Sequence, residues 1–172
     1  KPGQTNFVAV HVDTRPHTSR WYPGAGIYRK VQLVIREPVH VAHWGTYVTT
    51  PEVTSASASV RVETTLENHT ATAVAPDVET ILRDPKGKEI AKVRMGFSVP
   101  AHGAQPGVAT ITIGKPQLWD LKTPQLYTAV TRVFVAGKLV DATETPFGLR
   151  TFAFTANDGF HLNGRRVQLY GV

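Results

Sequence analysis

The chain has 172 residues, of which 41% are hydrophobic and 19% are charged, values typical of a globular protein and not of a disordered or fibrous one. It contains no cysteine, which excludes disulfides, thiolate metal sites and a catalytic thiol. The net charge of +6 comes from basic residues dispersed along the chain, whereas a nucleic-acid binder usually gathers them on one face, so we expect no nucleic-acid partner.

The first predicted strand covers residues 6–13. Val8, Val10 and Val12 alternate with other residues and would share one face, as in a strand half buried against a core. A loop that contains Pro16 follows this strand.

Residues 19–33 combine a turn with the start of a second strand. Pro23 fixes one backbone angle and two glycines follow it, so Trp21 and Tyr22 would sit on a constrained turn. Residues 27–36 are rich in β-branched and aromatic side chains, which predicts a strand. The residue types alone indicate a β-turn whose aromatic rings cap a hydrophobic core.

Residues 38–146 carry strand signals at the spacing of an all-β sandwich. The clearest strand is predicted at 59–67, where polar and apolar residues alternate. The other strands are predicted at 39–50, 78–82, 89–99, 108–113, 126–135 and 139–145, with turns at 84–88 and 136–138 and a loop at 100–107. About seven strands in about a hundred residues predict an antiparallel β-sandwich.

Two polar motifs in this region could bind a metal ion or accept a glycan. His40 and His43 would share one face of a helix, but residues three apart in a strand face opposite sides, so we expect no metal site. Asn68, His69 and Thr70 match an N-glycosylation acceptor, a signal that matters only in a eukaryotic secretory pathway.

The last segment, residues 147–172, predicts a hairpin. Asn163 and Gly164 lie between two apolar runs, which is the strongest short signal for a two-residue hairpin turn. No apolar run in the chain approaches the roughly 20 residues of a membrane helix, so we expect no membrane partner. The chain starts at Lys1 without a charged leader, which leads us to expect a piece of a longer protein, and its compartment stays open.

Three stretches, in this order, resemble glycoside hydrolase family 2, the family of β-galactosidases, β-glucuronidases and β-mannosidases. Ser-Arg-Trp-Tyr-Pro-Gly-Ala-Gly-Ile-Tyr-Arg at 19–29 resembles the end of its sugar-binding jelly-roll domain. Pro-Gln-Leu-Trp followed by Pro-Gln-Leu-Tyr, within 116–127, is similar to its immunoglobulin-like domain. Phe-Gly-Leu-Arg at 147–150, with residues 159–172, resembles the crossing into its catalytic (β/α)8 barrel.

The resemblance implies three regions. Residues 1–37 would be the last strands of an incomplete jelly roll, residues 38–146 an immunoglobulin-like β-sandwich, and residues 147–172 a linker with the first barrel strand at 167–172. Trp119 and Tyr127 would then be core and corner residues of the sandwich rather than a platform for sugar.

Retaining glycoside hydrolysis needs two carboxyl groups about 5 to 5.5 Å apart. Most of the 13 acidic residues fall at predicted turns or on outward strand faces. The family's acid/base carboxylate follows an Asn, and no Asn-Glu pair occurs in this chain, so no catalytic residue carries over. Phosphate loops, nucleophile elbows and a complete dinucleotide fingerprint are also missing, and we expect no cofactor and no metal.

We therefore expect a non-catalytic structural fragment of a β-galactosidase-like enzyme that hydrolyses O-glycosyl bonds in carbohydrates. If any residue contacts substrate in the full enzyme, the resemblance points to Arg20, Trp21 and Tyr22, although this chain has Arg20 where some members place a carboxylate. The alternative is a stand-alone carbohydrate-binding or adhesion module that presents Trp21, Tyr22, Trp44 and Tyr47. Sugar specificity and assembly into a homo-oligomer stay open.

Overall fold

The computed structural model describes residues 3–12 and 26–171. The chain divides into two compact units, Lys1–Ile35 and Arg36–Val172. In the first unit, every described residue is exposed and none belongs to a strand. The strands predicted at 6–13 and 27–36 are therefore wrong for the residues described, because a strand needs a hydrogen-bonded neighbour and neither segment has one there. The assignment of residues 1–37 to a jelly roll stays a prediction.

The second unit contains ten strands and, among the described residues, no helix, so none is long and apolar enough to cross a membrane. The first seven strands form its main body. They are β1 (Val39–Val53), β2 (Ser57–Asn68), β3 (Asp77–Arg83), β4 (Glu89–Gly96), β5 (Gly103–Gly114), β6 (Tyr127–Val135) and β7 (Lys138–Phe147).

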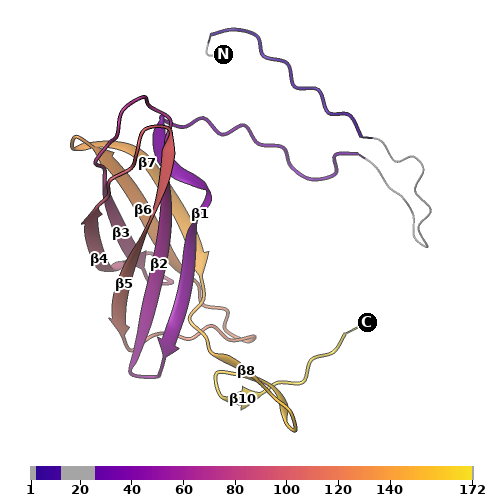
Figure 1. The fold of residues 1–172 in the computed structure, drawn as a ribbon. Coiled ribbons are helices and arrows are strands. Elements are labelled where there is room, and N and C mark those ends of the chain that lie inside the picture. The colour runs from indigo at the N-terminus through magenta and orange to yellow at the C-terminus, as the bar shows by residue number, and fades with distance from the viewer. Residues whose placement is uncertain (1–2, 13–25, 172) are drawn as a thin grey trace. The chain divides into compact units, whose positions relative to one another are not determined.

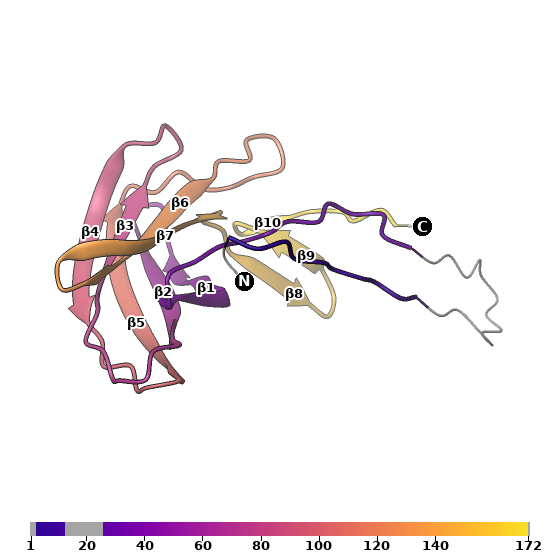
Figure 2. The ribbon, with the colours of Figure 1, turned by 90° about the horizontal axis from the view of Figure 1, so that it is seen from above.

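These seven strands form two antiparallel sheets that pack face to face (Figures 1 and 2). One sheet has the order β1-β2-β5 and the other β4-β3-β6-β7. Val60, Val62 and Ile111 of the first sheet pack with Leu82 and Ala129 of the second in one buried cluster. The predicted all-β antiparallel sandwich is confirmed, while its immunoglobulin-like assignment stays a prediction.

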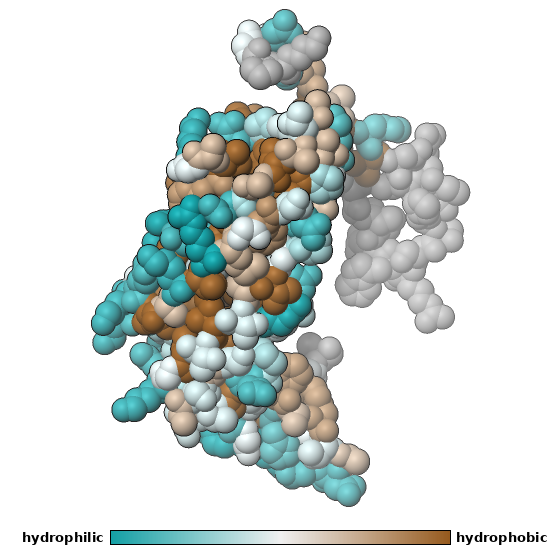
Figure 3. All heavy atoms as spheres, turned by 60° about the vertical axis from the view of Figure 1, so that its left-hand side comes forward, coloured by the Kyte–Doolittle hydropathy of each residue, from teal (hydrophilic) through white to brown (hydrophobic). Residues whose placement is uncertain are grey.

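Strand β2 shows why the sequence folds in this way. Its residues alternate between buried and half-buried along the whole strand, because successive side chains point to opposite faces. Val60 and Leu66 are fully buried, whereas Arg61 and Glu63 on the other face form an ion pair at 2.9 Å. On the face turned to the viewer in Figure 3, hydrophilic and hydrophobic residues are interspersed.

The predicted turns at 84–88 and 136–138 are confirmed. The Asp84 amide donates to the Lys88 carbonyl at 2.9 Å, and Gly87 has a φ of 82°. Ala136 and Gly137 both have positive φ, as a two-residue hairpin turn requires.

Strand β5 begins at Gly103, although the presence of Pro106 and two glycines predicted a loop up to 107. β5 lies at the edge of its sheet and pairs with β2 on one side. Proline lacks an amide hydrogen, but no strand on the open side of β5 needs one, so Pro106 is tolerated there. A Cβ at Gly107 would lie 2.3 Å from the Phe97 ring, so that glycine is required by packing.

A wide bulge interrupts β1. Val41 pairs with Leu66 and Thr46 with Thr64, so β1 uses three more residues than β2 over the same stretch. Within the bulge, Trp44 has a φ of 58°, an unusual conformation for a bulky residue. A Cβ at Gly45 would lie 2.8 Å from the Thr65 carbonyl oxygen, which explains glycine there.

Side chains cap the outer side of β1 just before the bulge. The Val41 amide donates to Asp141 Oδ2 of β7 at 2.9 Å, and Arg36 donates to the Val41 carbonyl. Arg36 also approaches Asp141 at 3.4 Å, so the three residues link the edges of the two sheets.

The remaining strands form a small antiparallel sheet of β8 (Phe152–Thr155), β9 (Gly159–Leu162) and β10 (Arg165–Arg166). Asn163 and Gly164 connect β9 to β10 with φ values of 51° and 74°, which confirms the predicted hairpin turn. Residues 167–171 belong to no strand here, and their assignment to the first strand of the catalytic barrel stays a prediction.

Candidate functional site

The residues that the sequence suggested for substrate contact, Arg20, Trp21 and Tyr22, lie outside the described residues. Two other aromatics of the carbohydrate-binding alternative are described. Trp44 is 87% exposed at the bulge and Tyr47 is 62% exposed on β1. Only Tyr47 of these two lines a cavity that the structure describes.

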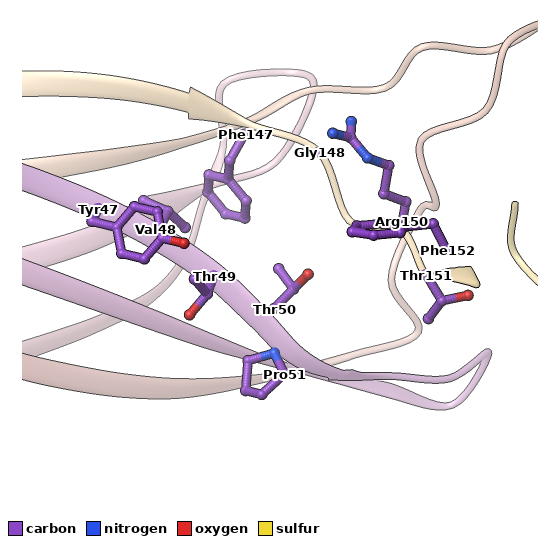
Figure 4. Close-up of a pocket in the computed structure, with 10 residues that line it drawn as sticks. All are labelled: Tyr47, Val48, Thr49, Thr50, Pro51, Phe147, Gly148, Arg150, Thr151 and Phe152. Atoms are coloured by element: carbon purple, nitrogen blue, oxygen red, sulfur yellow. The ribbon is translucent and has the colours of Figure 1, made fainter. Parts of the chain in front are cut away.

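That cavity, of about 540 Å³, is the candidate site (Figure 4). One wall comes from β1 and the other from the end of β7, the connection after it and the start of β8. The lining residues are Tyr47, Val48, Thr49, Thr50, Pro51, Phe147, Gly148, Arg150, Thr151 and Phe152. In Figure 4, the Tyr47 and Phe147 rings lie at one end, and Arg150, Thr151 and Phe152 at the other.

The connection between β7 and β8 is anchored in the sandwich core. Leu149 is fully buried, and its carbonyl accepts a hydrogen bond from the Trp119 amide at 2.8 Å. Gly148 lies against Trp119, because a Cβ there would be 3.0 Å from the Trp119 Cβ. The backbone just before Arg150 is therefore held against the sandwich by Gly148 and Leu149.

Arg150 supplies the charge of the site. Its guanidinium carbon lies 4.9 Å from the centre of the Trp119 ring, a cation–π contact that orients the side chain. It forms no ion pair with any carboxylate of the described residues. Its donors are thus available to a ligand with hydroxyl or carboxylate oxygens.

The lining of the cavity is rich in hydroxyl groups and aromatic rings. Tyr47, Thr49, Thr50 and Thr151 offer hydroxyl groups, and the aromatic rings offer apolar faces. The lining contains no carboxylate and no imidazole. A polyhydroxylated ligand matches this set of groups.

Tyr127 is a buried core residue, as predicted, whereas Trp119 is not fully buried. Tyr127 is 3% exposed, and its hydroxyl accepts a hydrogen bond from the Gln117 amide at 2.9 Å. Trp119 is half-buried beneath Arg150 and also lines a mostly apolar cavity of about 480 Å³ with Phe152 and Leu169.

One carboxylate near this region has a shifted pKa. The backbone amide of Lys122 donates to Asp120, and the Arg165 guanidinium binds the same carboxylate. These two donors lower the pKa of Asp120 below its ordinary value of 3.8, against a smaller opposing effect of desolvation. Asp120 therefore ties the loop before β6 to β10 and stays ionised at neutral pH.

The asparagine of the predicted glycosylation motif is buried in the folded chain. Asn68 is 1% exposed, and its Nδ2 donates to the carbonyls of Thr72 at 2.8 Å and Pro100 at 3.0 Å. Its Oδ1 accepts from the amide and hydroxyl of Thr70. The motif thus closes a turn instead of presenting an acceptor.

Sequence reasoning did not find Arg150 or this cavity. The alternation of residues predicts strands but not which strand end lies beside which connection, and the cavity depends on that arrangement. The only early signal was the placement of the Phe-Gly-Leu-Arg stretch directly after the sandwich.

Comparison with known proteins adds independent information. The model of the glycosyl hydrolases family 2 matches residues 39–150. Beta-galactosidase BoGH2A of Bacteroides ovatus is 42% identical over 98% of this chain, and a beta-glucuronidase of Formosa agariphila is 31% identical over 99% of it. Each alignment covers 20% of the relative, so the chain spans about a fifth of their length.

Solved structures agree with the fold. A glycosyl hydrolase family 2 member from Bacteroides cellulosilyticus superposes with a TM-score of 0.72 and 31% identity. The superposition covers 76% of this chain and 18% of that one.

Proposed function

Because the chain belongs to the glycosyl hydrolases family 2, we propose that it is a non-catalytic β-sandwich segment of a β-galactosidase-like enzyme that hydrolyses O-glycosyl bonds. Its role would be to hold neighbouring parts of that enzyme in place. Residues 1–37 would end a sugar-binding domain, residues 38–146 would be the supporting immunoglobulin-like sandwich, and residues 147–172 would lead into the catalytic barrel. Carbohydrate would be its partner only within the longer enzyme.

The observation that carries the proposal is how the carboxylates of the sandwich are used. None of them lines the candidate cavity, and several pair with guanidinium groups on the surface of the sandwich. Such pairs include Asp77 with Arg94, Glu79 with Arg132, Asp141 with Arg36 and Glu144 with Arg83. Two cooperating carboxyl groups facing one ligand, as retaining hydrolysis needs, are not among these arrangements.

The cavity between β1 and the β7–β8 connection would form part of the wall of the substrate pocket in the full enzyme. Its hydroxyl groups and the Arg150 guanidinium are suited to sugar oxygens, and the Phe147 and Phe152 rings to the apolar face of a sugar. These groups would position a carbohydrate, while the chemistry would take place elsewhere in the enzyme.

An activity assay tests the non-catalytic role. The purified 172-residue chain should not hydrolyse nitrophenyl β-D-galactoside or β-D-glucuronide above the buffer rate, whereas the longer enzyme that contains it should hydrolyse one of them. Turnover by the 172-residue chain, unchanged after repurification, would overturn the proposal.

One observation favours the second candidate, a stand-alone carbohydrate-binding or adhesion module. Trp44 is highly exposed in a strained backbone conformation, and an exposed tryptophan is a common platform for a sugar ring. A glycan array separates the two roles. Binding by the chain that is lost in Trp44→Ala supports the module, and no binding by either protein supports the structural role.

A further inference from the structure

His40, Glu67 and His69 meet where β1 begins and β2 ends. His40 is directly opposite Glu67 in the antiparallel pairing of the two strands. The Nε2 atom of His40 lies 3.5 Å from Glu67 Oε2, and the Nε2 atom of His69 lies 3.3 Å from the same oxygen. One donor atom from each residue thus falls within 4.8 Å of the others.

We propose that these three residues form a binding site for a divalent transition-metal ion such as Zn²⁺. Two imidazoles and one carboxylate are a known ligand set for Zn²⁺, with a fourth position left for water or another donor. Ligand atoms around a tetrahedral ion with bonds of about 2.0 to 2.1 Å lie about 3.3 Å apart. The two distances from Glu67 Oε2 match that spacing, and the ligand atoms of the two histidines lie within 4.8 Å of each other.

The hydrogen bond on the far side of His40 supports this assignment. Its Nδ1 lies 2.7 Å from the Glu37 carbonyl oxygen, which can only accept, so Nδ1 carries a proton. In neutral His40 the lone pair of Nε2 then faces the Glu67 carboxylate. In this orientation Nε2 can bind a cation together with the carboxylate, and a backbone carbonyl behind a ligating imidazole is the usual support in metal sites.

The two imidazoles already lie next to each other and to the carboxylate. The rings of His40 and His69 are stacked, with centres 5.4 Å apart and planes 15° from parallel. Both Nε2 atoms lie within 3.5 Å of Glu67 Oε2, so one ion could bind all three groups.

The fold holds the three ligands in place. Asn68, which lies between Glu67 and His69 in sequence, is buried and hydrogen-bonded on both sides of its amide. The His69 amide donates to the Pro38 carbonyl at 2.9 Å, which ties it to the start of β1. Ligands on such a fixed frame need little reordering to bind an ion.

Room for a fourth ligand is present beside the cluster. A cavity of about 260 Å³ is lined by Glu67, His69 and His102, with Asn68, Gly103 and Ala104. A water molecule there could complete the coordination. Sequence reasoning did not find this site, because its members become neighbours only through the register of β1 and β2. The i, i+3 pair of His40 with His43 is not part of it.

Metal titration of the 172-residue chain tests the proposal. After treatment with a chelator, the chain is titrated with Zn²⁺ against a chromogenic competitor, and with Co²⁺ while its visible d–d absorption is recorded. One equivalent should bind and raise the melting temperature. His69→Ala and Glu67→Gln should each weaken Zn²⁺ binding by at least about tenfold and abolish the Co²⁺ band.

Matched histidine variants outside the cluster serve as controls. His43→Ala and His161→Ala should bind Zn²⁺ like the unmodified chain, and His69 is exposed enough for its variant to fold, which a melt in chelator verifies. Absence of binding, binding that survives both cluster variants, or equal losses in the control variants would each overturn the proposal.

Discussion

Asn68 shows how one side chain can replace several backbone partners. It lies at the end of β2, where the chain leaves the sheet, and its Nδ2 donates to the carbonyls of Thr72 and Pro100. Its Oδ1 also orders Thr70 in the following turn. The buried amide thus ties two segments to the end of β2, and these hydrogen bonds stabilise this end of the sandwich.

Replacing Asn68 with alanine should therefore lower the free energy of unfolding by about 1 to 3 kcal/mol, since the hydrogen bonds of a buried amide are lost. Urea unfolding followed by tryptophan fluorescence measures the change. Asn157→Ala, at an exposed turn position, is the control and should be nearly neutral. Equal midpoints for the two variants would show that the Asn68 network contributes nothing.

Asp120 gives a prediction about pH. Its pKa is lower in the folded chain than the ordinary 3.8, so the folded state favours the ionised carboxylate. The stabilisation is present above pH 3.8 and is lost as the pH falls through the lower pKa of the folded state. Asp120→Asn should melt at a lower temperature than the unmodified chain at neutral pH, and the difference should shrink as the pH falls below 3.8. A difference that stays constant over this range would contradict the role given to Lys122 and Arg165.

At the scale of elements, the turn between β9 and β10 joins the small sheet to the sandwich. Asn163 adopts a φ of 51°, and its Nδ2 donates to the Trp119 carbonyl at 2.9 Å. Its Oδ1 accepts from the Thr151 amide at 3.0 Å. One residue therefore both shapes the turn and attaches it next to the candidate cavity.

Two substitutions separate these contributions. Asn163→Gly keeps the left-handed backbone and loses the side-chain bonds, whereas Asn163→Ala loses both, so alanine should destabilise the chain by about 1 kcal/mol more than glycine. Thermal unfolding gives the ranking, and amide exchange of residues 159–166 shows whether the hairpin detaches. If glycine proves as harmful as alanine, the backbone conformation is not what the asparagine supplies.

Local patterns predicted the strands of the sandwich well, and the reasons can be seen in particular residues. The alternation along β2 and the Asn163-Gly164 turn are encoded within a few residues, so the sequence sufficed for them. The start of β5 was missed because Pro106 usually ends a strand, and its tolerance depends on the edge position. The bulge at Trp44 was missed because it is defined by pairing with β2.

The candidate site was less accessible to prediction than the strands. Its two walls come from residues 47–51 and 147–152, which are far apart in sequence, and only the closed sandwich brings them together. The residues first suggested, Arg20, Trp21 and Tyr22, rested on a resemblance, and they stay a prediction.

At the scale of the whole molecule, the division after Ile35 predicts independent stability of the second unit. Removing residues 1–35 should leave the melting temperature of the sandwich unchanged, because the described residues of that segment are all exposed. Removing residues 1–37 should lower it, because Arg36 no longer pairs with Asp141 or caps the Val41 carbonyl. Calorimetry on both truncations provides the measurement, and a fall of equal size in the two would place the boundary elsewhere.

The bulge in β1 also affects how copies of the chain behave at high concentration. An edge strand offers a row of free amides and carbonyls to which a foreign strand can add, the first step toward fibrils. Three extra residues with Trp44 at positive φ break that row, so an incoming strand loses register within a few residues. Deleting His43–Gly45 would straighten the edge, and we expect the shortened chain to form larger particles in light scattering and to bind thioflavin T. The bulge would thus protect the chain against amyloid-like growth. A deletion variant that stays monomeric would show that other features provide this protection.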